Sequence, residues 1–338
     1  MRDQFGDATL PLTISIAVFA AAIFLSAALI ALLLPLFRRY ALAHPNARSS
    51  HRAPTPQGAG LAVVTATIVI SAAVIFWRGP SLEVWTVFIA TILIAIVGAV
   101  DDMRAIGVVP RLLLQAVAAL IVIAALPDAL RIAPALPFLV ERALLLIALL
   151  WFVNLTNFMD GIDWMTVAEV VPVTAGLVIA GVMGALPGEQ ATVALVLCGA
   201  MLGFAPFNKP VARIFLGDVG SLPIGLITGW LLLTLAGNGH AAAALLLPLY
   251  YLADATITLL RRLAAGEKIT QAHRAHFYQR ALDGGLSASQ IVARVFLLNV
   301  ALAVLALATL QNPALPMQLG ALAVGCVLTA AQLRRFSR

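Results

Sequence analysis

Long apolar runs alternate with short polar connections along almost the whole chain. The runs approach the roughly 20 residues that a helix needs to cross the hydrocarbon core of a bilayer. They lie near residues 11–37, 58–77, 82–100, 109–126, 138–155, 166–186, 190–207, 219–236, 240–260, 291–310 and 314–333. Their continuity differs from the alternating pattern of a membrane barrel. The pattern therefore predicts an all-α polytopic membrane protein with about eleven transmembrane helices.

Composition agrees with a membrane protein and excludes an ordinary soluble one. Of the 338 residues, 62% are hydrophobic and 11% are charged, against roughly 45–50% and about 25% in soluble domains. The two cysteines, Cys198 and Cys326, lie apart in apolar runs, so no disulfide framework is expected. The first apolar run is too long for the core of a cleavable signal peptide and is expected to remain as a membrane anchor.

The distribution of Lys and Arg predicts which side of the membrane each connection faces. All but four of the 21 basic residues fall in or beside residues 38–57, 101–111, 208–218, 261–290 and 334–338. The other four are Arg2, Arg78, Arg131 and Arg142. The positive-inside rule then places the N-terminus outside and the C-terminus in the cytoplasm. The same bias explains the net charge of +6, so no nucleic-acid partner is expected.

All the polar motifs fall on this cytoplasmic side. We expect a single integral-membrane domain over residues 1–338, whose active site is formed by the cytoplasmic loops 38–57, 101–111, 154–165, 208–221 and 261–290. A transporter would carry its polar site near the middle of the bilayer, typically between two repeated halves. The sequence has no convincing internal repeat, yet a transporter or lipid-binding protein stays an alternative from a different class.

The first two loops carry groups suited to phosphate chemistry. Arg48, His51 and Thr55 combine cations and hydroxyls, as an oxyanion-binding surface does. The run Pro-Thr-Pro-Gln-Gly-Ala-Gly at 54–60 predicts a rigid turn that brings backbone close to a ligand. Asp101 and Asp102 follow an apolar helix, where the helix dipole disfavours negative charge. Such a pair is explained by a general base or a divalent cation.

The stretch 154–163 places amides and carboxylates between two apolar runs, where unpaired polar groups are costly. Asp160 and Asp163 are three residues apart and share a face if the segment is helical. Asn154 and Asn157 have the same spacing, and their side chains can both donate to and accept from a base or a sugar amide. We therefore interpret the stretch as part of a site.

The fourth loop, Phe215 to Ser221, has the features of an anion-binding turn. Its glycines let backbone amides approach a diphosphate at the start of the next helix. Asp218 fits there if a divalent cation bridges it to phosphate oxygens. Phe215 is suited to stack on a base, although a core position is also open, and Asn208 is suited to polar recognition.

The last loop contains His273, Arg274 and His276. The histidine spacing would allow zinc, but no cysteine lies near, and the arginines favour phosphate or sugar contacts. Asp254 lies inside the ninth apolar run, where an acid is either functional or bonded to a neighbouring helix. Together the motifs indicate a Mg²⁺-dependent site for a diphosphate whose acceptor is a lipid phosphate.

In their order along the chain, from Arg48 to Arg280, the five motifs resemble those of the polyprenyl-phosphate N-acetylhexosamine-1-phosphate transferases, glycosyltransferase family 4. This family includes enzymes that start O-antigen and enterobacterial common antigen synthesis and is related to the muramoyl-pentapeptide translocase. The resemblance implies transfer from UDP-N-acetylhexosamine, such as UDP-N-acetylglucosamine, to undecaprenyl phosphate, with release of UMP. It implies a multi-pass protein of the bacterial inner membrane with a cytoplasmic active site, in lipopolysaccharide or cell wall biogenesis, and is compatible with a homodimer.

The resemblance also implies roles for individual residues. Asp101, Asp102, Asp160 and Asp163 are expected to be catalytic, and Asp218 is expected to bind Mg²⁺, with Asp102 as a second candidate ligand and Mn²⁺ as an alternative ion. The substrate-binding candidates are Arg48, His51, Thr55, Asn154, Asn157, Asn208, Phe215, Ser221, His273, Arg274 and His276.

Some positions depart from the family pattern. Trp164 stands where a small residue is common, and Gln57 and Ala59 alter the first turn. The spacing His273-Arg-Ala-His276 replaces three successive histidines and favours the aminosugar branch, which leaves a muramoyl-pentapeptide donor as the alternative. We expect a single displacement with Asp101 or Asp102 as the base, whereas a covalent aspartyl intermediate stays open.

Overall fold

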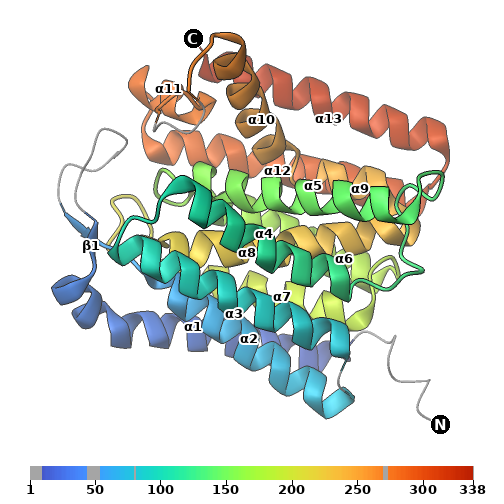
Figure 1. Cartoon of the computed structure of the whole chain (residues 1–338), viewed down its shortest axis with the longest axis horizontal. Helices are drawn as coiled ribbons and strands as arrows, with labels where there is room; N and C mark the ends of the chain where they lie inside the picture. The colour runs from blue at the N-terminus through green and yellow to red at the C-terminus, as the bar shows by residue number, and fades with distance from the viewer. Residues whose placement is uncertain (1–9, 44–53, 80, 269–272, 338) are drawn as a thin grey trace.

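The computed structural model describes residues 10–43, 54–79, 81–268 and 273–337, and this part of the chain is almost entirely helical (Figure 1). The helices are α1 Leu12–Tyr40, α2 Ala59–Arg78, α3 Leu82–Met103, α4 Val108–Ala125, α5 Phe138–Met159, α6 Met165–Val182, α7 Gly188–Phe204, α8 Asp218–Leu235, α9 Ala241–Leu246, α10 Leu249–Ala264, α11 Phe277–Asp283, α12 Ala288–Gln311 and α13 Leu315–Phe336. Two short strands, β1 Leu42–Ala43 and β2 Thr55–Pro56, pair antiparallel.

All the apolar runs but 240–260 each form one helix, as predicted. In the described ranges, 9 helices are long and apolar enough to cross a membrane, which confirms a polytopic all-helical protein. The run 190–207 forms α7, which is shorter at 17 residues. The run 240–260 does not form one helix, because it breaks between α9 and α10 at Pro248, which has no backbone N–H to continue the ladder. The exact number of crossings stays a prediction.

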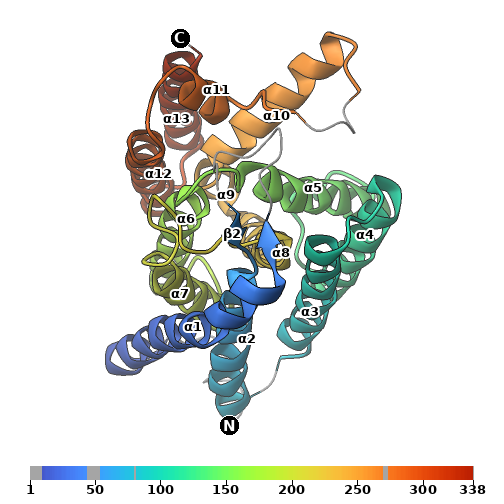
Figure 2. The same cartoon turned by 90° about the vertical axis from the view of Figure 1, so that its left-hand side faces the viewer.

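Helix α8 occupies the centre of the bundle, with α2, α3 and α5 around it (Figure 2). Almost all of its residues are buried, including Trp230 at 0% exposure. A helix that is apolar on every side is stable only when it is surrounded by other elements. The start of α8 is therefore held from several directions at once.

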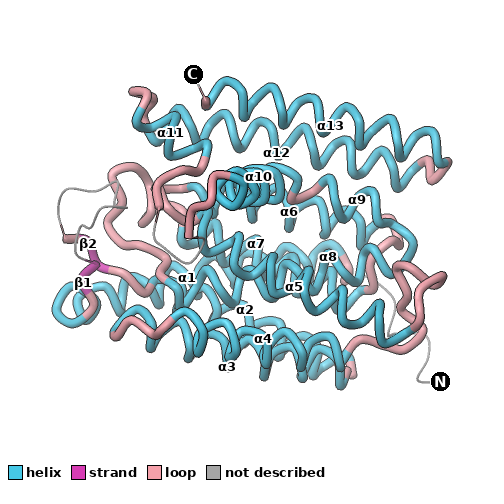
Figure 3. Tube along the Cα trace, turned by 45° about the horizontal axis from the view of Figure 1, so that its top comes forward, coloured by secondary structure: helices cyan, strands magenta, loops and turns pink. Residues whose placement is uncertain are grey.

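The connections that were expected to share one face gather at one end of the bundle, together with β1 and β2 (Figure 3). Gln57 forms a parallel bridge with Phe215, and the hydroxyl of Tyr278 donates to the backbone oxygen of Phe158 at 3.1 Å. Helix α1 begins at the opposite end from the one at which α13 ends (Figure 1). The orientation of the chain across the membrane stays a prediction.

Candidate active site

Asp102 caps the start of α8. This helix begins at Asp218, after Gly217 with φ 77°, and its own N-cap residue supplies no side-chain bond. The two oxygens of Asp102 accept from the backbone N–H of Asp218 at 3.0 Å and of Val219 at 3.1 Å. Gln57 in turn donates to the backbone oxygen of Asp102 at 3.0 Å. A carboxylate that is misplaced at the end of α3 is thus well placed at the positive end of α8.

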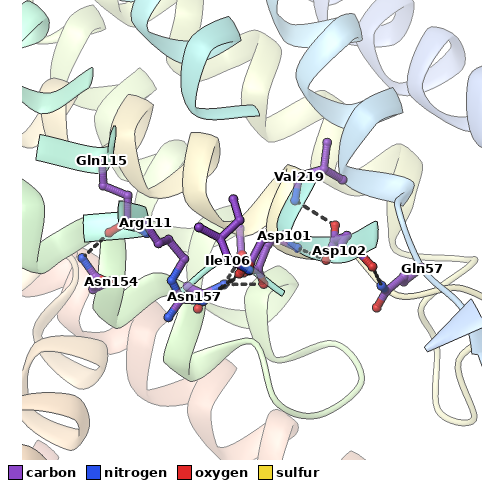
Figure 4. A network of polar contacts seen from close by, with 11 residues as sticks. Gln57, Asp101, Asp102, Ile106, Arg111, Gln115, Asn154, Asn157 and Val219 are labelled. Atoms are coloured by element: carbon purple, nitrogen blue, oxygen red, sulfur yellow. Dashed lines mark hydrogen bonds and ion pairs between the residues drawn. The ribbon is translucent and has the colours of Figure 1, made fainter. Parts of the chain in front are cut away.

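Arg111, from the first turn of α4, lies beside two carboxylates (Figure 4). Its guanidinium nitrogen is 2.8 Å from Asp101 Oδ2 and 3.6 Å from Asp218 Oδ2. The backbone N–H of Ile106 also donates to Asp101 Oδ1 at 2.6 Å. The side chains of Asp101 and Asp218 contact each other. Two carboxylates in contact repel unless a proton or cations lie beside them, and Arg111 supplies one positive charge. We call Asp101, Arg111 and Asp218 the aspartate–arginine cluster.

Asn157 joins the end of α5 to this cluster. Its amide donates to Asp218 Oδ1 at 2.7 Å and to the hydroxyl of Ser221 at 2.9 Å. Asn154, one turn earlier, instead donates to Gln115 of α4 at 2.8 Å and is buried. The structure therefore brings Asn157 and Ser221 to Asp218, whereas Asn154 lies in a contact between helices.

Asp160 and Asp163 do not share a helical face, because the segment that carries them is not helical. Helix α5 ends at Met159 and α6 begins at Met165, with Trp164 in the left-handed region at φ 63°. Asp160 accepts a hydrogen bond from the hydroxyl of Thr166, and buried Asp163 accepts from the backbone N–H of Ala212 at 2.9 Å. Burial, together with the carboxylates of Asp102 and Asp163, raises the pKa of Asp160 to about 6.

Asn208 and Trp164 fasten two loops to each other. The side-chain oxygen of Asn208 accepts from the backbone N–H of Trp164 at 2.8 Å, and its amide nitrogen donates to Ile214 at 3.0 Å. The indole of Trp164 donates to the backbone oxygen of Ala205 at 2.6 Å. Both polar ends of the Asn208 amide are thus used within the protein, so the structure gives it a role in loop packing.

Only part of the first loop, residues 38–57, lies within the described residues. Arg48 and His51 lie outside the described residues, whereas Thr55 is buried in β2. The backbone N–H of Phe215 donates to Pro56 at 2.8 Å, and its carbonyl accepts from Gly58 at 3.1 Å. The turn expected to approach a ligand therefore approaches the segment that leads into α8.

The histidine motif packs against the end of α5. The ring of His276 lies 5.0 Å from that of His273 and 6.5 Å from that of Phe158, measured between centroids. Arg274 forms an ion pair with Asp283 at 2.9 Å. The motif thus lies next to the loop that carries Asp160.

The carboxylates of the aspartate–arginine cluster suit an open Mg²⁺ site better than a site in which the protein supplies every metal ligand. Among the described residues, no group of three or more His, Cys, Asp or Glu side chains is arranged to hold a metal ion. Mg²⁺ often uses only one or two carboxylates and completes its shell with waters and substrate phosphates. Asp218 and Asp101 fit this chemistry. Asp102 stays a second candidate ligand, since each of its oxygens accepts one backbone hydrogen bond at the start of α8 and keeps a further lone pair.

Arg111 is the main site residue that the sequence interpretation missed. The sequence pattern marks it only as one of the basic residues expected on the cytoplasmic side. Arg111 lies ten residues after Asp101, in the first turn of the next helix, and this position is the sequence feature that could have indicated a contact between the two.

Comparisons with known proteins find similarity to one group of transferases. Residues 84–236 match the model of glycosyl transferase family 4. The decaprenyl-phosphate N-acetylglucosaminephosphotransferase of Mycolicibacterium smegmatis is 29% identical over 299 residues, which cover 76% of this chain and 72% of that protein. A probable undecaprenyl-phosphate N-acetylglucosaminyl 1-phosphate transferase of Bacillus subtilis is 27% identical over 277 residues, covering 77% and 74%.

A phospho-N-acetylmuramoyl-pentapeptide-transferase of Streptococcus thermophilus is 40% identical, but only over 85 residues, or 24% of each chain. These matches confirm the resemblance predicted from the motifs: residues 84–236 are similar to glycosyl transferase family 4, and about three quarters of the chain is similar to polyprenyl-phosphate N-acetylglucosamine phosphotransferases.

Proposed function

We propose that this protein transfers an N-acetylhexosamine 1-phosphate from a UDP-sugar to a polyprenyl phosphate, such as undecaprenyl phosphate, and releases UMP. The observation that carries the proposal is the aspartate–arginine cluster at the start of α8, which pairs carboxylates for a cation with a guanidinium for phosphate. The names of the relatives support a polyprenyl phosphate acceptor and an N-acetylglucosamine donor group. The site would face the cytoplasm of a bacterial inner membrane.

The donor diphosphate would bind at the cluster. Asp218 and Asp101 would hold Mg²⁺, whose positive charge would stabilise the negative charge that develops on the leaving phosphate. Arg111 lies close enough to both carboxylates to orient them and to contact a phosphate oxygen. Asn157 holds Asp218 in place through its 2.7 Å hydrogen bond.

An apolar cavity supports a lipid acceptor. It has a volume of about 220 Å³ and lies between α5, α8, α9 and α10, with Leu149, Phe152, Leu232 and Leu252 among its lining residues. Phe152 precedes Asn157 on α5, so the cavity lies on the helix that leads to the cluster. A polyprenyl chain could occupy such a cavity while its phosphate reaches the site.

We favour a single displacement. An oxygen of the acceptor phosphate attacks the phosphorus that carries the sugar, the bond to UMP breaks, and UMP leaves. Asp101 or Asp102 would act as the base, since each carboxylate accepts two hydrogen bonds within the protein, Asp101 from Ile106 and Arg111 and Asp102 from Asp218 and Val219. Trapping a covalent phosphosugar on the protein would instead favour the two-step route.

The direct test is release of UMP by the purified protein with UDP-N-acetylglucosamine, undecaprenyl phosphate and Mg²⁺. EDTA should stop the reaction, and added Mg²⁺ should restore it. A panel of UDP-sugars that includes UDP-N-acetylmuramoyl-pentapeptide would identify the donor and separate a surface-polysaccharide role, such as O-antigen synthesis, from peptidoglycan synthesis. Release of UMP from none of them would favour a transporter or a lipid-binding protein.

Substitution of Arg111 should slow transfer without unfolding the protein. Arg111→Gln removes the cation beside Asp101 and Asp218, so we expect a loss of about 100-fold in turnover, as for other single charge-stabilising donors. The matched control is Arg104→Gln, since Arg104 is exposed near the same loop. Equal rates for the two variants would contradict the role assigned to Arg111.

The pH dependence of transfer should reflect the ionisation of Asp160. Its pKa is raised to about 6, chiefly by burial. If transfer needs the carboxylate form, kcat/KM should fall about tenfold per pH unit below that pKa. The hydrogen bond from Thr166 lowers the pKa of Asp160, so Thr166→Val should move the acid limb to higher pH. Thr86→Val, which removes an exposed hydroxyl bonded to Leu82 in the first turns of α3, is the control. If the acid limb of Thr166→Val stays at the pH of the native protein, the assignment of that limb to Asp160 is contradicted.

A further inference from the structure

Asp254 of α10 is fully buried and lies at the centre of a set of hydrogen bonds. It accepts from the hydroxyl of Tyr250 at 3.1 Å on its own helix. It also accepts from the backbone N–H of Phe277 at 3.0 Å and of Tyr278 at 3.3 Å, in the first turn of α11. Its Oδ1 lies 3.2 Å from Nδ1 of His276. One carboxyl group thus holds the start of a second helix and a histidine ring.

These partners define the hydrogen that His276 carries. Backbone N–H groups can only donate, so Asp254 acts as an acceptor on both oxygens. With Asp254 in the carboxylate form, which has no hydrogen to give, the 3.2 Å contact places a hydrogen on Nδ1 of His276. Nε2 is then the ring nitrogen that can accept a hydrogen bond.

The first turn of α11 is held by Asp254 together with a capping box between His276 and Gln279. His276 is the N-cap residue, and its backbone N–H is taken by Gln279 at 3.3 Å. The next two amides would be buried without a partner if Asp254 were absent, which is costly away from water. Asp254 therefore fixes both the position of α11 and the orientation of the imidazole.

Tyr278 extends this arrangement to the loop of Asp160. Its hydroxyl donates to the backbone oxygen of Phe158 at 3.1 Å. Gly161 lies directly against the same hydroxyl, because a Cβ at this position would come within 2.0 Å of it. The contacts therefore run from α10 through the first turn of α11 to the residues on both sides of Asp160.

We propose that Asp254 is a positioning residue: it holds His276 with its hydrogen on Nδ1 and fastens α11, through Tyr278, against the loop that carries Asp160. The kinetic consequence rests on the proposed function and on the expectation, implied by the family resemblance, that His276 contacts the substrate. The arrangement also decides between the two interpretations of Asp254 that the sequence left open. Asp254 bonds to a neighbouring helix, and through that bond it serves the site.

The first experiment is independent of activity. Nitrogen NMR of ¹⁵N-histidine-labelled protein in nanodiscs reports whether Nδ1 or Nε2 carries the hydrogen, and a His276→Gln sample assigns the signal. We expect a protonated Nδ1 in the native protein and a changed Nδ1 signal in Asp254→Asn. A native His276 without a hydrogen on Nδ1 would overturn the proposal, even if Asp254→Asn failed to fold.

The second experiment measures transfer kinetics. Asp254→Asn should raise the KM for the UDP-sugar about tenfold or more, because an orienting partner of a histidine is lost, while the KM for the lipid phosphate changes little. Glu83→Gln is the matched control, since Glu83 is another acid in a helix but binds Trp230 at 2.8 Å. An equal rise in both KM values would contradict the positioning role. If the native protein shows no transfer, the proposed function fails, and the NMR result still decides the role of Asp254.

Discussion

Asp218→Asn is expected to lower the rate of sugar-phosphate transfer about a thousandfold, or ~4 kcal/mol in activation free energy. The substitution keeps the size of the side chain and an oxygen that can accept from Asn157, which lies 2.7 Å away. It removes the charge that a Mg²⁺ ion would need and that Arg111 faces at 3.6 Å. The loss should therefore come from charge, because the packing at the start of α8 is retained.

The measurement is UMP release at increasing Mg²⁺ concentration, with thermal unfolding in detergent as the test of folding. Asp128→Asn is the control, since Asp128 is exposed in the connection between α4 and α5. We expect the control to keep native turnover. A folded Asp218→Asn protein with full activity would show that the metal assignment is wrong.

The sequence was informative about the fold because a lipid environment imposes a simple pattern. Runs of about 20 apolar residues have few alternatives to a helix. The sequence was less informative where a run was apolar but its backbone could not continue, as at Pro248 between α9 and α10. The spacing of Asp160 and Asp163 was equally compatible with a helix and with the turn that Trp164 forms at φ 63°.

The cluster of motifs was predictable, but the partner of each side chain was not. Asp102 looked misplaced at the end of α3 because its partners, the amides of Asp218 and Val219, are 116 and 117 residues away along the chain. Arg111 was indistinguishable from the basic residues that mark the cytoplasmic side. Both assignments need the packing of α3, α4 and α8, which no local pattern encodes.

The packing of α3 against α8 leads to the second large effect, at Gly98. This residue lies one turn before Asp102, and a Cβ there would come within 2.3 Å of the backbone oxygen of Asp218 and 2.6 Å of the backbone nitrogen of Val219. Small residues allow such close approach of helices in membranes. Gly98→Ala must therefore separate the two helices at the point where Asp102 caps α8.

We expect Gly98→Ala to lower transfer about 100-fold, because a displacement of about 1 Å at a catalytic group can cost that much. The hydrogen bonds from Asp218 and Val219 to Asp102, at 3.0 and 3.1 Å, have little length to spare. Gly320→Ala in α13 is the matched control, since a Cβ there meets nothing within 4 Å. UMP release and thermal unfolding of both variants separate lost positioning from lost folding. Native turnover in Gly98→Ala would mean that the start of α8 tolerates displacement, and that the cap by Asp102 is not what holds Asp218 in its active position.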